Sequence, residues 1–210
     1  IGTGFNSGKD YEKLENARLL DPSEYILNEK LGYISLNAAL NADEVLAVAY
    51  EYTVRGEIHT VGELTSNAPA APSTLVVKML RSTTQSPKMP TWDLMMKNVY
   101  NIGSYNLSAE DFVLDILYQN DKAGTMVNYL PAGDIDNKIL LSVMNLDRLN
   151  TQLDAIPDGR FDYIEGITVY SNKGRIVFPV LEPFGGWLEK KINRPGVAGQ
   201  YVYKDLYEKT

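Results

Sequence analysis

Short runs that alternate apolar and polar residues, bounded by turn residues, constrain this chain more than any other feature. In "EVLAVAYEYTV", every second residue from Leu46 to Val54 is apolar or aromatic. In "DFVLDILYQ", the residues from Phe112 to Tyr118 repeat that pattern. Successive side chains of a strand point to opposite faces, so this alternation predicts strands with one buried face. The chain is therefore expected to be mainly β.

Three pairs of these runs carry hairpin signals. They are "YILN" and "GYISLN", joined by "EKL"; "AYEYTV" and "EIHTVGEL", joined by Arg55-Gly56; and "YIEGITVY" and "GRIVFPVL", joined by the loop 171–174. Short loops that contain glycine are typical of β-hairpins. About nine runs of strand length occur, close to the strand number of a jelly roll. We therefore predict a β-sandwich, jelly-roll-like or Ig-like, built from two packed sheets.

Helical signals are fewer. "TWDLMMKNVYNIG" predicts a short helix over 91–99 with Thr91 as N-cap, and "SAEDF" predicts a single turn capped by Ser108. A C-terminal helix that begins at Pro195 would place Val202 and another apolar side chain, Leu206, on one stripe.

The predicted domain organisation follows from these elements. A β-sandwich domain covers 1–190, and a C-terminal helical extension covers 191–210. The segment 65–74, rich in Ala, Pro and Ser, is interpreted as a surface loop within the first domain. The abrupt beginning "IGTGFNSGK" and the end "KDLYEKT" favour a piece cut from a longer protein.

Composition limits the possible partners. The formal net charge is −7, which argues against nucleic acid or an anionic membrane surface as partner. The sequence contains no Cys and a single His, His59, so a zinc site, a thiolate nucleophile or a His-based triad cannot be assembled. No apolar run approaches the roughly 18 residues that a membrane-spanning helix needs. The chain itself is therefore not expected to span a membrane.

Other candidate sites are weak. Asp134 with Asp136, or Glu63 with a distant acid, could form a carboxylate pair, but 27 acidic residues produce such pairs by chance. Gly185-Gly186 has neither phosphate-loop nor dinucleotide spacing and favours a flexible turn. The 14 Tyr and two Trp could stack on sugars, although at strand period they are more often packing residues. We predict no enzyme, no catalytic residues and no cofactor.

The stretch "DAIPDGRFDYIE", 154–165, approaches a calcium loop. Its candidate ligands are Asp154, Asp158, Asp162 and Glu165, with Gly159 at the glycine position and Phe161 at the apolar position. The third position is Ile156, which cannot ligate, and Pro157 follows it. We favour a turn in which Asp158 bonds the following backbone and Phe161 starts a strand over 162–169. Calcium binding is expected to be weak or absent, and we predict no metal site.

The longest phrases resemble one family. "LDPSEYILNEKLGYISLNAALNADEVLAVAYEYT", "MPTWDLMMKNVYNIG", "LLSVMNLDRLN", "PDGRFDYIEGITV" and "NKGRIVFPVLEPFG" are similar to the SprA/Sov family, from about Lys9 to Thr210. This family forms the outer-membrane translocon of the Bacteroidetes type IX secretion system, tied to gliding motility in some members. The resemblance implies a very large β-barrel with globular insertions. The chain lacks barrel hairpins with lipid-facing alternation, so it resembles an insertion.

Two functions are therefore expected. The first is a non-enzymatic structural or interaction domain that shapes or caps the barrel mouth, or docks envelope proteins and cargo during export and gliding. Its location would be the cell envelope, on the extracellular or periplasmic face of the outer membrane. The alternative is a carbohydrate-binding β-sandwich, possibly stabilised by calcium.

Overall fold

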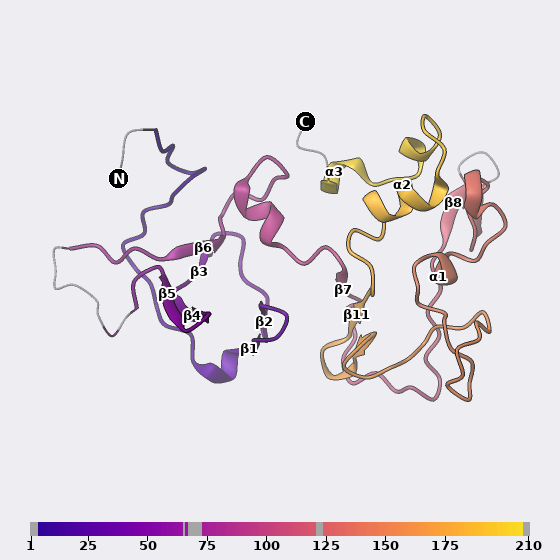
Figure 1. The fold of residues 1–210 in the computed structure, drawn as a ribbon, viewed down its shortest axis with the longest axis horizontal. Coiled ribbons are helices and arrows are strands. Elements are labelled where there is room, and N and C mark those ends of the chain that lie inside the picture. Colours follow the sequence, from indigo (N-terminus) through magenta and orange to yellow (C-terminus); the bar gives the residue numbers. More distant parts are fainter. Residues whose placement is uncertain (1–3, 65, 67–72, 121–123, 208–210) are drawn as a thin grey trace. The chain divides into compact units, whose positions relative to one another are not determined.

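A computed structural model describes residues 4–64, 66, 73–120 and 124–207 of the chain (Figure 1). The fold consists mainly of small antiparallel sheets with few helices, which confirms the mainly β prediction. The chain divides after Met95 into two compact units, here called unit 1 and unit 2. The predicted division at residue 190 stays a prediction, and that residue lies inside helix α2 (Gly186–Ile192). Among the described residues, no helix is long and apolar enough to cross a membrane.

Unit 1 consists of three two-stranded antiparallel pairs, β1–β2, β4–β5 and β3–β6, and short 3-10 turns. Its elements are η1 (Pro22–Glu24), β1 (Tyr25–Asn28), β2 (Tyr33–Leu36), β3 (Leu46–Val48), β4 (Tyr50–Val54), β5 (Glu57–Val61), β6 (Lys78–Arg81) and η3 (Pro90–Leu94). The first two predicted hairpins are confirmed. The predicted loop 65–74 lies largely outside the described residues.

The β4–β5 hairpin is specified by its turn. Arg55 (φ 52°) and Gly56 (φ 89°) both have left-handed backbone conformations. A two-residue turn with positive φ at both positions matches the twist of the flanking strands. Val54 consequently pairs with Glu57 at the closed end of the hairpin.

The described residues of unit 1 form almost no buried core. Met89 and Ser82 are the only buried residues among those described up to Met95. Every residue of β4 is exposed. Two-stranded hairpins without such packing are at best marginally stable in water. The strands of unit 1 thus form without enclosing an interior.

Unit 2 contains a three-stranded antiparallel sheet of order β10-β11-β7, the hairpin β8–β9 and most of the helices. Its elements are β7 (Val99–Asn101), β8 (Tyr118–Asn120), β9 (Thr125–Val127), η4 (Gly133–Ile135), α1 (Leu140–Val143), β10 (Val169–Tyr170), η5 (Ser171–Lys173), β11 (Arg175–Val177), α2, η6 (Ala198–Gln200) and α3 (Lys204–Tyr207). The third predicted hairpin is confirmed as β10–β11, with shorter strands than expected.

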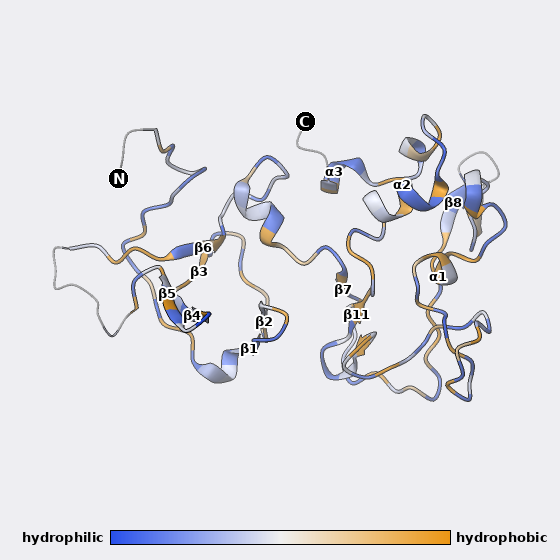
Figure 2. Cartoon of the chain, in the orientation of Figure 1, coloured by the Kyte–Doolittle hydropathy of each residue, from blue (hydrophilic) through white to orange (hydrophobic). Residues whose placement is uncertain are grey.

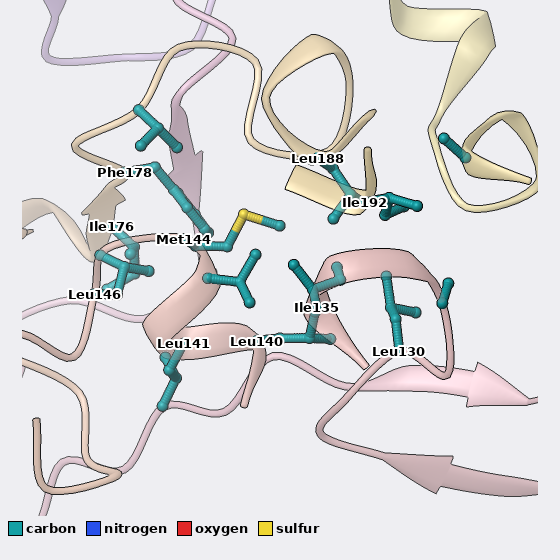
Figure 3. Close-up of a cluster of buried hydrophobic side chains, with 14 of the residues drawn as sticks. Leu130, Ile135, Leu140, Leu141, Met144, Leu146, Ile176, Phe178, Leu188 and Ile192 are labelled. Atoms are coloured by element: carbon teal, nitrogen blue, oxygen red, sulfur yellow. The ribbon is translucent and has the colours of Figure 1, made fainter. Parts of the chain in front are cut away.

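The hydrophobic core of unit 2 is assembled from short elements far apart in sequence (Figure 3). Its buried side chains come from η4, α1, β11, α2 and the loops beside them, and they include Leu141, Met144, Leu146, Ile176, Phe178, Leu188 and Ile192. In Figure 2 the ribbon of α1 is coloured largely as hydrophobic, which agrees with the burial of most of that helix.

Two glycines allow this close packing. A Cβ on Gly133 would lie 1.9 Å from the carbonyl oxygen of Ile192, and one on Gly174 would lie 1.5 Å from that of Ser104. Both glycines also have positive φ. Any larger residue at these positions would have to displace backbone.

Three predictions of regular structure are wrong. The helix over 91–99 with Thr91 as N-cap is replaced by η3, whose N-cap is Met89, and by the strand β7. Pro90 starts a single tight turn, and β7 then pairs with β11, so a long-range contact outweighs the local helical spacing.

The other two errors lie further along the chain. The strand over 162–169 is reduced to β10, because Thr168 Oγ1 bonds the backbone of residues 162 and 164 and folds the segment back. The C-terminal helix is broken into η6 and α3, so Val202 lies between helices.

Candidate functional site

The four carboxylates of the stretch that approaches a calcium loop do not converge. Asp158 Oδ1 accepts a hydrogen bond from the Arg160 amide at 3.0 Å, as the turn interpretation predicted. Glu165 accepts from the Ser171 amide at 3.1 Å, and Asp154 accepts from the Asn150 side chain at 3.2 Å. Each carboxylate thus bonds a different segment.

The fourth carboxylate, Asp162, belongs to a reciprocal arrangement with Asp147. Asp162 accepts from the amides of Arg148 (2.7 Å) and Leu149 (3.2 Å). Asp147 accepts from the amides of Asp158 (3.0 Å) and its neighbour Gly159 (3.2 Å). Asp162 therefore binds the backbone directly after Asp147, and Asp147 binds the backbone three and four residues before Asp162. We call this pair the carboxylate clasp.

Asp147 is buried, with 2% of its surface exposed. The Ser142 hydroxyl donates a third hydrogen bond to it at 2.5 Å. A buried carboxylate with three donors is satisfied without a cation. The sequence analysis did not single out Asp147. Its one signal in the sequence is its position directly after the largely apolar run that ends at Leu146.

No metal cluster is formed by the described residues, in the sense of three or more His, Asp or Glu side chains placed to hold one ion. Ile156, the non-ligating third position, is 59% exposed. Weak or absent calcium binding stays a prediction. A bound ion would have to displace the hydrogen bonds that these four carboxylates accept.

The other candidate carboxylates have structural roles. Glu63 accepts from the Val76 amide at 2.7 Å and so holds two segments of unit 1 together. Asp134 accepts from the Asn193 side chain at 2.8 Å in unit 2. Asp136 caps the end of η4. All three acids are exposed.

Gly185-Gly186 opens helix α2, with Gly185 as its N-cap. A Cβ on Gly185 would approach the Tyr207 ring to 2.5 Å, so this glycine permits close packing and is more than a flexible turn. Trp187 follows and donates from Nε1 to the carbonyl oxygen of Val143 at 2.9 Å.

Tyr207 lies near Tyr100 and Lys97 in unit 2. Burial raises the pKa of Tyr207, and it also raises the pKa of Tyr100. Lys97 lies 5.9 Å from the Tyr207 ring centroid and 3.6 Å from Glu182. Both phenols therefore stay protonated at neutral pH, and neither is activated as a base.

A cavity of about 340 Å³ in unit 2 is lined by Lys138, Ser142 and Lys191, among others. The Ser142 hydroxyl is committed to Asp147, and Lys191 Nζ lies 4.7 Å from the centroid of the Trp187 ring. The serine is thus bonded to a carboxylate that is itself held by two amides.

One side of the exposed β4–β5 hairpin carries three adjacent rings. Tyr52 is paired across the strands with His59, and their rings stack at 5.1 Å. Tyr50 lies 6.0 Å from Tyr52, centroid to centroid, on the same face. We call Tyr50, Tyr52 and His59 the aromatic face. His59 is an exposed strand residue, as predicted.

The aromatic face has the chemistry of a binding surface. Three adjacent rings offer flat apolar area together with phenol and imidazole groups that can donate and accept hydrogen bonds. The strand register holds the rings before any ligand arrives, which lowers the entropic cost of binding. No protein-family model and no curated protein matches this chain.

Proposed function

We propose that this chain is a non-enzymatic structural and interaction domain of a type IX secretion outer-membrane translocon. The family assignment rests on the sequence resemblance alone. In this proposal the domain belongs to the cell envelope, on the extracellular or periplasmic face of the outer membrane. It shapes or caps the barrel mouth, or docks envelope partners and cargo, during protein export and gliding motility.

The observation that carries the interaction role is the exposed aromatic face, on a unit whose described residues bury only Met89 and Ser82. Tyr50 and Tyr52 are each 45% exposed although they stand in regular strands. Exposed aromatic side chains, fixed in position, are typical of interaction surfaces. A β-sandwich would further require these small sheets to pack face to face, and it remains part of the proposal.

Site-specific photo-crosslinking tests the interaction role. A photo-crosslinking phenylalanine analogue replaces Tyr52 in the translocon of a bacterium with this secretion system, and mass spectrometry identifies the linked peptides. The matched control places the same analogue at Thr53, on the opposite face of the strand. We expect links from position 52 to the translocon or to envelope proteins. Equal links from both positions would contradict a specific surface.

The second candidate, a carbohydrate-binding module, is favoured by the same three rings, because aromatic faces stack on sugar rings. A glycan array with the 210-residue chain tests it, with Tyr52→Ala as the variant and Tyr105→Ala, an exposed tyrosine elsewhere, as control. Binding lost only in Tyr52→Ala would favour the sugar function. For the calcium-stabilised version, a melting temperature unchanged between EDTA and millimolar CaCl₂ is expected.

A further inference from the structure

Residues 112–117 form a segment of unit 2 with one packed face and one open face. Phe112, Leu114 and Ile116 pack against the core, whereas Val113 is 82% exposed and Leu117 52% exposed. Burial that alternates at every residue indicates an extended backbone. The sequence predicts a strand over this segment, whereas in the structure the strand β8 begins only at Tyr118.

The backbone of this segment has no partner strand. Within the described part of the chain, no main-chain N–H or C=O group of 112–117 takes part in a hydrogen bond. Pairing begins at Tyr118, which faces Val127 of β9, and the chain after β9 turns away to bridge Tyr129 with Ile139. The segment is therefore an unpaired extension of β8.

The segment is nevertheless fixed in place. The Phe112 ring lies 5.7 Å from Phe161 and 5.3 Å from Tyr163, centroid to centroid. At the other end, Tyr118 lies 5.5 Å from Tyr201. A strand held at both ends by ring contacts presents its backbone groups without first having to be ordered.

We propose that residues 112–117 are a strand-addition site for an extended peptide segment that alternates basic and apolar side chains. An unpaired strand edge is a template for another strand. Alternate residues point their N–H and C=O groups to the same edge, so either edge offers three residues for pairing. This site goes beyond the proposed function and does not depend on the translocon assignment.

The charge of the open face selects the partner. Asp115 is exposed on the same face as Val113 and Leu117, and Asp111 is exposed in the turn that directly precedes the segment. Opposite charges across a strand pair are favourable, and like charges are unfavourable. A second copy of this segment would bring its own Asp111 and Asp115 close to these acids, so a basic partner is favoured over self-association. On the packed side, apolar residues of the partner would extend the row that contains Leu114.

The test uses the 210-residue chain and an eight-residue peptide, capped at both ends, that alternates lysine and valine. Fluorescence anisotropy gives the affinity, and amide hydrogen exchange locates the site. We expect new protection confined to 112–117. We also expect at least tenfold weaker binding of a glutamate–valine peptide, and of a lysine–valine peptide methylated on every backbone nitrogen.

A protein variant separates this site from nonspecific attraction. Asp111→Asn with Asp115→Asn should weaken binding about tenfold, whereas Asp205→Asn, at an exposed acid elsewhere in unit 2, should leave it unchanged. Protection at another segment, equal binding of the methylated peptide, or no binding at millimolar peptide would each overturn the proposal. The crosslinking result for the aromatic face is independent of all three.

Discussion

Unit 1 and unit 2 contain the same kind of strand but differ in what the strands enclose. Both form short antiparallel pairs, and both have turns with positive φ. In unit 2 the helices α1 and α2 bring buried leucines against β11, whereas in unit 1 the described residues bury only Met89 and Ser82. The difference teaches that hairpin register is set locally by the turn, whereas an interior needs contacts between distant segments.

The two tryptophans make this comparison measurable. Trp92 belongs to unit 1 and Trp187 to unit 2. The variants Trp187→Phe and Trp92→Phe therefore report on one unit each. Because the units need not unfold together, each is followed by its own fluorescence transition.

The largest effect is expected from the core. Leu146→Ala should lower the free energy of unfolding of unit 2 by about 2–5 kcal/mol, because Leu146 has 0% exposure and its loss leaves a cavity. Leu31→Ala in unit 1, where the side chain is 75% exposed, should change it by less than about 0.5 kcal/mol. Urea titrations of the single-tryptophan proteins measure both. Equal losses would show that unit 1 has an interior after all.

Glycine replacement gives the next largest contrast. Gly174→Ala should destabilise unit 2 by about 3 kcal/mol, because the left-handed conformation costs about 1–2 kcal/mol and the clash with Ser104 adds overpacking. Gly32→Ala in unit 1 has a similar φ of 68° with no atom nearby, so only the first cost, about 1 kcal/mol, applies. Thermal melts compare the two. A Gly32 variant as damaging as the Gly174 variant would refute the packing explanation.

Removal of a buried carboxylate from unit 2 should cost more stability than removal of an exposed carboxylate from unit 1. Asp147→Ala leaves two amides and a hydroxyl without their buried acceptor and should cost about 1–3 kcal/mol. Glu63→Ala removes one bond to an exposed segment of unit 1 and should lower the free energy of unfolding by about 0.5–1 kcal/mol. Urea midpoints of the two variants provide the comparison. The reverse order would mean that unit 1 depends on its surface bonds.

The smallest effect concerns pH in unit 1. The Arg18 guanidinium, at 2.7 Å, lowers the pKa of Glu24 from 4.5 to about 2, and the Asp21 amide assists. A folded-state pKa below the unfolded one stabilises fully above pH 4.5, and this contribution is lost as pH falls toward 2. Solvent and salt screen this exposed pair, so the change is small. An NMR titration of Glu24 should give a midpoint near 2 that rises in Arg18→Gln; an unchanged midpoint would exclude the ion pair as the cause.

Local features of the fold were predictable from sequence. Arg55-Gly56 placed the β4–β5 turn, because glycine adopts positive φ without steric cost in a two-residue hairpin turn. The alternation from Phe112 to Tyr118 correctly indicated which side chains face the core. It could not show that most of this segment lacks a partner, because pairing depends on where β9 ends.

The features that the sequence did not predict depend on contacts between residues far apart in the chain. Thr168, which looks like a strand residue, bonds back to residue 162 and ends the expected strand. Asp158 was correctly placed in a turn, but its amide is held by Asp147, eleven residues earlier in the chain. For the candidate site, the exposure of His59 was predictable, whereas its stacking on Tyr52 required the strand register.

The carboxylate clasp also determines how the chain between Asp147 and Asp162 would respond to mechanical force. Asp162 bonds the amides of Arg148 and Leu149, which directly follow Asp147, so tension applied to the two ends of this segment loads these bonds first. Once they break, the bonds from Asp147 to the amides of Asp158 and Gly159 carry the load. The segment would therefore lengthen in two stages, at up to about 3.3–3.6 Å per residue released.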